Sequence, residues 1–296
     1  MLTVFYSSEY VGSAYAFATT RKAAWVADSL TAAPIRGIEL VTPRPLTREQ
    51  LIRVHDPGYV RAVETGVPRF LAESQGFDWD PGLWRMVLSS NGGAVAAALA
   101  ALEHKRAGSL SSGLHHARHH TGAGFCTFNG LVLAAIEALS AGAQHVLIID
   151  FDAHCGGGTS SLIATQPRIW QIDVSVNRFD SYQSSDRASL AIVSAARNYL
   201  STIERSLRDL QRRAPRFDLC LYNAGMDPVQ TCTIGGLAGI TPDILAQREQ
   251  LVFDWCRARN LPVAFVLAGG YIGAALDQRA LVELHRFTIT AAAAAA

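Results

Sequence analysis

The feature that most constrains the fold is a set of three apolar runs that each end in polar or glycine-rich residues. The runs read HVLIIDFDAH from His145, LCLYNAGMD from Leu219 and VAFVLAGGY from Val263. Continuous β-branched apolar runs are typical of strands buried on both faces. Helix-like segments between them predict crossover connections and a parallel sheet. Because open parallel sheets bind ligands outside the carboxyl ends of their strands, we expect the three polar ends to converge on one functional edge.

The rest of the chain continues this alternation. We expect a single α/β domain over residues 1–290, with a central, mostly parallel sheet flanked by helices, and a poly-alanine tail over 291–296. Two more strands are expected at Leu2–Tyr6 and Arg168–Val174. Helices are expected at Arg21–Leu30, Thr47–Thr65, Pro81–His104, Leu131–Ala141, Ser189–Arg212 and Asp243–Arg259. Thr47 with Gln50 three residues later is a capping-box pattern.

Composition excludes several classes of protein. Apolar residues make up 49% of the chain and charged residues 17%, which predicts a sizeable core rather than disorder. The formal net charge of +1 provides no general basic field for nucleic acid. No run approaches a membrane span, and no N-terminal stretch has the layout of a secretion signal. Five cysteines without a C-x-x-C pair indicate reduced thiols and a cytoplasmic protein. The oligomeric state has no sequence signal.

The end of the first run carries candidate metal ligands. Asp150, Asp152 and His154 alternate, so they leave the strand on one side. Buried carboxylates are costly unless they are paired or bind metal, and a helix-capping cluster or ion-pair network is the alternative. Asp227 suits a third ligand, or else a turn before Pro228. Three protein ligands with open positions are typical of catalytic zinc, although Fe(II), Co(II) or Mn(II) also fit. The following glycine run lacks a phosphate-loop signature.

Two further groups could assist chemistry at this edge. His115 and His116 are adjacent, and histidine is the usual general acid–base at neutral pH. His119 and His120 favour a solvated polar loop or adventitious metal binding. Tyr271 follows a Gly-Gly turn at a strand end, where a phenol can donate to an oxyanion or simply pack.

The chain resembles the histone deacetylase and acetylpolyamine amidohydrolase family, over nearly its whole length and in the same order of motifs. The matching segments are Leu51–Val60, Asn91–Gly93, His115–Ala117, Gly124–Asn129, Ile149–His154, Ala224–Asp227, Gly235–Leu237 and Leu267–Tyr271. The resemblance implies the arginase-like three-layer α/β fold. It also implies hydrolysis of an N-acetyl or other N-acyl amide on a small molecule or an acyl-lysine.

The resemblance assigns roles to numbered residues. It implies one zinc ion on Asp152, His154 and Asp227, and a potassium ion near Asp150 and Ser175. It implies that His116 acts as the base and that His115, tied to Asp150, supplies electrostatics and orientation. Tyr271, with zinc, would stabilise the oxyanion. The expected substrate tunnel consists of Gly124, Phe125, Gly270 and, on the opposite wall, Tyr182.

The chain also departs from the family pattern. Family members place a histidine and then an aspartate or asparagine after the ligand histidine, whereas this chain has Cys155 and Gly157. The carboxylate or amide that would orient His116 is therefore missing from this loop, so either another group serves or activity is weakened. Thr19 to Lys22 replaces the N-terminal His-Pro-Glu-x-Arg pattern, and Arg21 would keep one basic contact.

Two other functions compete with deacetylation. A catalytically silent zinc-containing binding protein is supported by the gap at Gly157. An arginase-like manganese ureohydrolase requires a further aspartate where Gly156 stands, which argues against it. The sequence leaves acetyl-lysine, acetylpolyamine and a secondary metabolite open as substrates.

Overall fold

A single parallel sheet organises the molecule. The structure, a computed structural model, describes residues 1–13 and 18–295. Its eight-stranded sheet has the order β2-β1-β3-β8-β7-β4-β5-β6, and every pair of neighbours is parallel. The strands are β1 (Leu2–Phe5), β2 (Ile38–Val41), β3 (Arg106–Ser109), β4 (Val146–Asp150), β5 (Ile169–Ser175), β6 (Ala188–Ile192), β7 (Leu219–Ala224) and β8 (Val263–Leu267). The expected parallel α/β sheet is confirmed.

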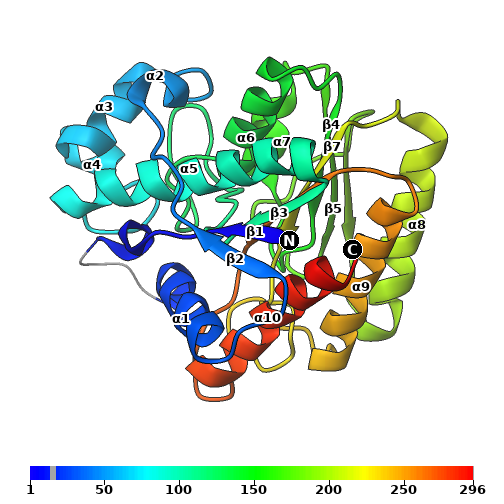
Figure 1. Cartoon of the computed structure of the whole chain (residues 1–296). Coiled ribbons are helices and arrows are strands. Elements are labelled where there is room, and N and C mark those ends of the chain that lie inside the picture. The colour runs from blue at the N-terminus through cyan, green and yellow to red at the C-terminus, as the bar shows by residue number, and fades with distance from the viewer. Residues whose placement is uncertain (14–17, 296) are drawn as a thin grey trace.

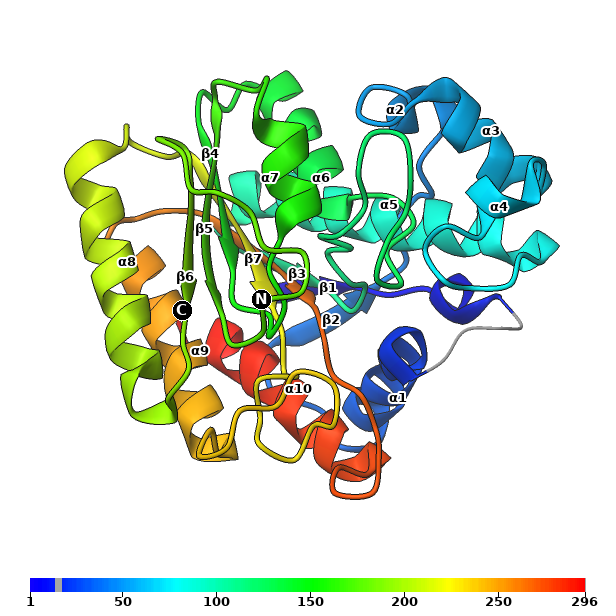
Figure 2. The same cartoon turned by 180° about the vertical axis from the view of Figure 1, so that it is seen from behind.

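Helices cover both faces of the sheet (Figures 1 and 2). One face carries α1 (Ala18–Ala32), α8 (Tyr199–Arg213), α9 (Pro242–Arg257) and α10 (Gln278–Ala294). The other carries α5 (Pro81–His104), α6 (Gly130–Ser140) and α7 (Gly157–Ile163), and α3 (Pro57–Thr65) packs against α5. Two one-turn helices, α2 (Arg48–Leu51) and α4 (Arg69–Ala72), flank α3, and short 3-10 turns occupy Ser8–Val11 and Ala196–Asn198.

The central strands contribute side chains to two hydrophobic cores, one on each face of the sheet. In β4, Leu147 and Ile149 belong to the core under α8, α9 and α10, whereas Val146 and Ile148 belong to the core under α5 and α6. Successive side chains of a strand point to opposite faces, so a strand covered on both sides must be apolar throughout. This is why the VLIID run of β4 is buried along its whole length.

Two expected helices differ from the observed ones: the first is divided in two, and the second begins later than expected. The stretch Thr47–Thr65 is not one helix: the capping box at Thr47 is present, but α2 ends at Leu51 and α3 starts at Pro57, capped by Asp56. Pro at the first helical position favours such a new start. The expected helix Ser189–Arg212 is wrong over its first part, where β6 forms the edge of the sheet, and α8 begins only at Tyr199.

The expected poly-alanine tail is also wrong. Residues 291–294 continue α10, and Ala291 and Ala292 are buried in the core. Alanine has the highest helix propensity and its small side chain allows close packing, so such a run extends a docked helix. Residues up to 295 therefore belong to the same α/β unit.

Helix α5, with 24 residues, is the longest of the described helices. Contrary to the expectation from sequence, it is long and apolar enough by composition to cross a membrane, but 61% of its most apolar stretch is buried inside the protein. Core helices pass the same test. A Cβ on Gly93 of this helix would lie 1.7 Å from the hydroxyl oxygen of Tyr10, so glycine is required for this close approach.

Candidate functional site

Three potential metal ligands meet where β4, β7 and β8 end. Asp152, His154 and Asp227 are buried, and their ligand atoms lie within 4.8 Å of one another. The Nδ1 atom of His154 is 3.1 Å from Asp152 Oδ1 and 3.1 Å from Asp227 Oδ2. Backbone amides orient the carboxylates: Gly269 donates to Asp152 at 2.7 Å, and Ala153 donates to Asp227 at 3.0 Å. The expected convergence of the strand ends is therefore present.

This donor set fits a metal ion. Ligands at about 2.0 Å in tetrahedral geometry are about 3.3 Å apart, close to the two 3.1 Å spacings around His154 Nδ1. Asp227 Oδ2 is buried, and apart from its 3.1 Å approach to His154 Nδ1 it has no hydrogen-bond partner among the described residues. Burial, followed by repulsion from Asp152, raises the pKa of Asp227 to about 6. A cation bound by both carboxylates would satisfy that oxygen and relieve the repulsion.

His115 is held by residues from two strands. Its Nδ1 lies 2.8 Å from Asp150 Oδ2 at the end of β4. The other oxygen of Asp150 accepts a 2.8 Å bond from the side-chain amide of Asn223 at the end of β7. All three groups are buried. Asn223 therefore orients the carboxylate that orients His115, a role that the sequence pattern did not reveal.

His116 does have a carboxylate partner, so another group serves in place of a side chain at position 157, the first of the two alternatives that the sequence left open. Its Nδ1 lies 2.9 Å from Asp180 Oδ2, in the loop that follows β5. The backbone N–H of Gly158 donates to the same oxygen at 3.0 Å, and Arg118 donates to the other oxygen. The partner is present but comes from a different segment of the chain.

The two neighbouring imidazoles have opposite electrostatics. Burial lowers the pKa of His115, but the carboxylates of Asp150 and Asp152 more than offset this and raise it to about 10. Burial, followed by the positive charge of His115, lowers the pKa of His116 to about 4, against the opposing effect of Asp180. The pair therefore favours one charged and one neutral ring.

A cavity leads to these groups. Its lining includes the candidate ligand Asp152, His115 and His116, and also Gly124, Phe125 and Tyr271. Phe125 has a positive φ of 67°, and its backbone N–H donates to Gln75 at 2.8 Å, which fixes the turn at the cavity wall. Burial raises the pKa of Tyr271 far above its usual value, so its hydroxyl keeps its proton.

Two expected tunnel residues lie elsewhere. Tyr182 is not among the lining residues; its hydroxyl donates to the carbonyl oxygen of Ser189 at 3.1 Å. Phe179, in the same loop, instead faces the site: its ring is edge-on to His116 at 4.9 Å and to His154 at 6.0 Å. The lining contains Gly269 in place of Gly270. Phe179 and Tyr182 thus belong to the same loop, and Phe179 is the one whose ring contacts the candidate site histidines.

A second set of oxygens lies beneath the metal group. The hydroxyl oxygen of Ser175 is 3.1 Å from the carbonyl oxygen of His154 and 2.5 Å from the carboxylate of Asp173. Asp150 and Asp173 are register partners in the β4–β5 pair, and both are buried. Burial, followed by the charge of Asp150, raises the pKa of Asp173. A monovalent cation among these oxygens would reduce this repulsion.

Lys22, next to Arg21 in the sequence, is a buried basic residue near the site. Lys22 is buried, with its ammonium 3.4 Å from the hydroxyl of Ser112, whereas Arg21 is exposed. Burial lowers the pKa of Lys22 to about 8, against the attraction of Asp152 and Asp227. Lys22 therefore brings a basic group of the N-terminal segment close to the candidate ligands, and the basic contact expected of Arg21 stays a prediction.

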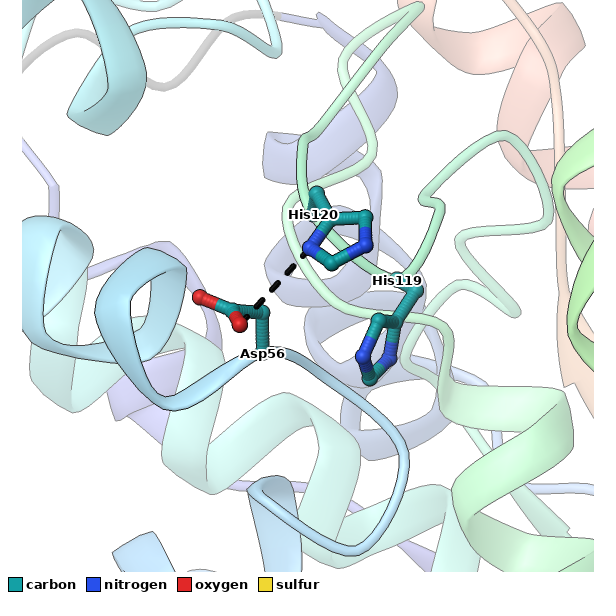
Figure 3. A group of neighbouring side chains, drawn as sticks. All are labelled: Asp56, His119 and His120. Carbon is teal, nitrogen blue, oxygen red and sulfur yellow. Dashed lines mark ion pairs between the residues drawn. The ribbon is translucent and has the colours of Figure 1, made fainter.

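Asp56, His119 and His120 form a second group that could hold a metal ion, drawn in Figure 3. Both histidines are exposed, and His120 Nδ1 lies 3.7 Å from Asp56 Oδ2. Two of these residues also make contacts that hold the loop in place: Asp56 caps α3, and His119 Nδ1 lies 2.7 Å from the carbonyl oxygen of Val54. This agrees with a polar surface loop that is anchored to the start of α3.

Comparisons with known proteins identify relatives over most of the chain. The sequence model of the histone deacetylase domain matches residues 16–286. An uncharacterized protein of Picosynechococcus sp. is 33% identical over 242 residues, which cover 80% of each chain. Histone deacetylase 2 of Arabidopsis thaliana is 30% identical over 189 residues, 61% of this chain but 48% of the relative, so the match spans about half of that protein.

Solved structures show the same fold. The HD domain of HDA15 superposes with a TM-score of 0.81 at 21% identity, covering 98% of this chain and 90% of that one. Acetylpolyamine aminohydrolase from Burkholderia pseudomallei also has a TM-score of 0.81, at 19% identity and 99% coverage of both chains.

Proposed function

This chain belongs to the histone deacetylase domain family, and we propose that it is a zinc-dependent deacetylase that hydrolyses linear N-acyl amides. One observation carries the proposal: Asp152, a member of the Asp152–His154–Asp227 group, lines a cavity that is also lined by His115, His116 and Tyr271. Metal ligands, acid–base groups and an oxyanion donor are the components that amide hydrolysis requires.

We assign zinc to the three-ligand group. One imidazole nitrogen and two carboxylates leave positions open for water and substrate, as in catalytic zinc sites. Zinc bound there would act as a Lewis acid toward an amide carbonyl and would acidify a water molecule. We assign a potassium ion to the oxygens around Asp150, Asp173 and Ser175, where a buried pair of carboxylates favours a cation.

The two histidines divide the proton chemistry. Each engages a carboxylate through Nδ1, so each presents its Nε2 to the cavity. We assign to His116 the removal of a proton from the attacking water and its later delivery to the leaving amine. His115, held by Asp150, orients the water and stabilises the charge that develops beside it.

Tyr271 and the cavity walls act on the substrate. The protonated phenol of Tyr271 donates to the oxygen of the tetrahedral intermediate. Phe125 and Phe179 provide aromatic surface near the histidines, which suits the methylene chain of an acyl-lysine or an acylated polyamine. The five cysteines are unpaired, and all are buried, which supports a cytoplasmic location. We assign neither nucleic acid nor membrane as a partner.

The competing function is a silent zinc-containing binding protein. The argument for it was that Gly157 provides no side chain to orient His116, but Asp180 provides the carboxylate instead. The deciding experiment loads the purified protein with zinc and measures release of free amine from acetyl-lysine peptides and acetylpolyamines. We expect turnover that a chelator abolishes. Tight binding of a hydroxamate with no turnover on any acyl amide would establish the binding protein instead.

A further inference from the structure

Position 157 cannot accommodate a side chain in this protein. A Cβ added to Gly157 would lie 2.2 Å from the backbone oxygen of Asp180 and 2.5 Å from its Oδ1. Real Cβ atoms do not approach other atoms this closely, and one of the blocking atoms is backbone, which cannot swing away. Asp180 therefore occupies the space that a side chain at position 157 would fill.

Asp180 is held as an acceptor of three hydrogen bonds. Its carboxylate receives the N–H of Gly158 and the guanidinium of Arg118, and it faces Nδ1 of His116 at 2.9 Å. The side chain is only 7% exposed. An ionised carboxylate is solely an acceptor, so His116 must be the donor in the third contact. The proton of its ring is thereby placed on Nδ1, and Nε2 keeps a lone pair toward the cavity.

The loop that carries Asp180 is fastened to the metal-ligand segment. The N–H of Cys155 donates to the carbonyl oxygen of Phe179 at 3.0 Å, and the N–H groups of Val176 and Asn177 both donate to Ala153. Asp180 itself has a positive φ of 57°, a conformation that aspartate tolerates better than most residues. These bonds set the carboxylate with the precision that orienting a ring requires.

We propose that Asp180 is the positioning residue for His116, supplied by the loop after β5 in place of a side chain at position 157, with Arg118 as its counter-ion. The expected effect on kcat rests on the proposed function, whereas the contact between Asp180 and His116 does not. The assignment explains why Gly157 coexists with an intact histidine pair: the carboxylate has moved to another segment, and glycine leaves it room.

The test compares Asp180→Asn with Asp186→Asn, a matched change at an exposed aspartate six residues later. For Asp180→Asn we expect kcat to fall about 10²-fold with KM within about twofold, because ring orientation affects proton transfer more than substrate binding. Zinc content should be unchanged. Arg118→Gln should lower kcat less, since Gly158 still orients the carboxylate. Asp186→Asn should match wild type.

A second readout does not depend on turnover. Nitrogen NMR of histidine-labelled protein, with the His116 signal assigned from a His116→Asn variant, reports which ring nitrogen carries the proton. We expect Nδ1–H in wild type and in Asp186→Asn, and loss of this single tautomer in Asp180→Asn. An unchanged tautomer together with wild-type kcat would overturn the proposal. If wild type hydrolyses no amide, the proposed function fails, while the NMR result still decides the role of Asp180.

Discussion

The rings of His115 and His116 lie 3.9 Å apart, centroid to centroid, yet their Nδ1 atoms face carboxylates from two different segments. Asp150 ends β4, and Asp180 lies in the loop after β5. Two adjacent imidazoles with separate supports can be altered one at a time. This makes their division of labour open to experiment.

If His116 is the base, its removal should cost more than the removal of its neighbour. We expect His116→Ala to lower kcat by about 10²–10⁴-fold, the usual contribution of a general acid–base, and His115→Ala to have a smaller effect. Steady-state kinetics on zinc-loaded variants would show this. The reverse order would transfer the proton chemistry to His115.

Tyr271→Phe should separate oxyanion stabilisation from metal binding. The change removes only the hydroxyl of a buried residue, so the fold and the zinc content should persist. Loss of one such donor typically costs about 10²–10³ in kcat. Turnover and zinc content are to be measured on the same preparation. Turnover equal to wild type would exclude the phenol from the reaction.

Zinc should stabilise the fold by binding to the buried Asp152–His154–Asp227 group. Binding to the surface group Asp56–His119–His120 (Figure 3) should not contribute. Ligand at about 1,000 times its Kd adds about 4 kcal/mol to the free energy of unfolding. We expect a zinc-dependent rise in Tm for wild type and for His120→Ala, and none for His154→Ala. A rise that disappears in His120→Ala but persists in His154→Ala would place the tight site at the surface.

His55 should make stability depend on pH. Its Nδ1 lies 2.9 Å from the carbonyl oxygen of Arg118, and its Nε2 accepts the N–H of Asn129 at 3.0 Å. Burial lowers its pKa to about 4, so the unfolded chain binds this proton more readily than the folded protein does. The stabilising contribution is complete above pH 6.5 and is lost as the pH falls toward 4, by about 3 kcal/mol in total.

Denaturant titrations between pH 4 and 7 would measure this contribution. We expect His55→Gln to be less stable at neutral pH but to show a shallower decline on acidification. His104→Gln, whose side chain is 62% exposed, should decline as wild type does. Parallel curves for wild type and His55→Gln would assign the acid sensitivity to other groups.

A buried ion pair behind the metal-ligand strand should matter for folding. The side chains of Arg248 and Glu249 are fully buried, with a separation of 2.6 Å. Arg248 also donates to the carbonyl oxygen of Phe151 at 2.9 Å, next to the first ligand. Arg248→Met leaves a buried carboxylate unpaired, so we expect a loss of about 3–5 kcal/mol in the free energy of unfolding.

The double variant Arg248→Met with Glu249→Gln should recover part of this loss, because the unpaired charge is removed as well. Arg208→Met, which breaks an exposed i,i+4 pair with Glu204, should change stability by less than about 0.5 kcal/mol. Chemical unfolding of the three variants provides the comparison. Equal losses in the single and double variants would show that packing, not charge, is responsible.

The sequence predicted the centre of the molecule better than its edges. Strands β4, β7 and β8 were predictable because strands covered on both faces must be apolar throughout, and their polar ends then mark the site. Strand β6 was missed because its half-buried residues read as one side of an amphipathic helix. The break before Pro57 was missed because helical periodicity resumes after it.

The missed site residues share a physical cause. Asp180 lies 64 positions from His116, and nothing in its own loop marks it as a partner. Asp173 is a single carboxylate within an apolar strand. Its proximity to Asp150 becomes evident only when β5 pairs with β4. Contacts that depend on sheet registry and loop closure have no local signature, whereas ligands that alternate on one strand do.

Phe179 and Asp180 are adjacent in sequence, and both contact His116: Phe179 packs edge-on against its ring, and Asp180 faces its Nδ1. A substitution at Phe179 that adapts the site to a new acyl group could therefore also shift Asp180 and, through it, the orientation of the His116 ring. Phe77 and Phe125, whose ring centroids lie 5.7 Å apart, line the cavity from segments that lie outside the loop after β5. We therefore expect substitutions that change the substrate range to be tolerated more readily at Phe77 and Phe125 than in the loop after β5.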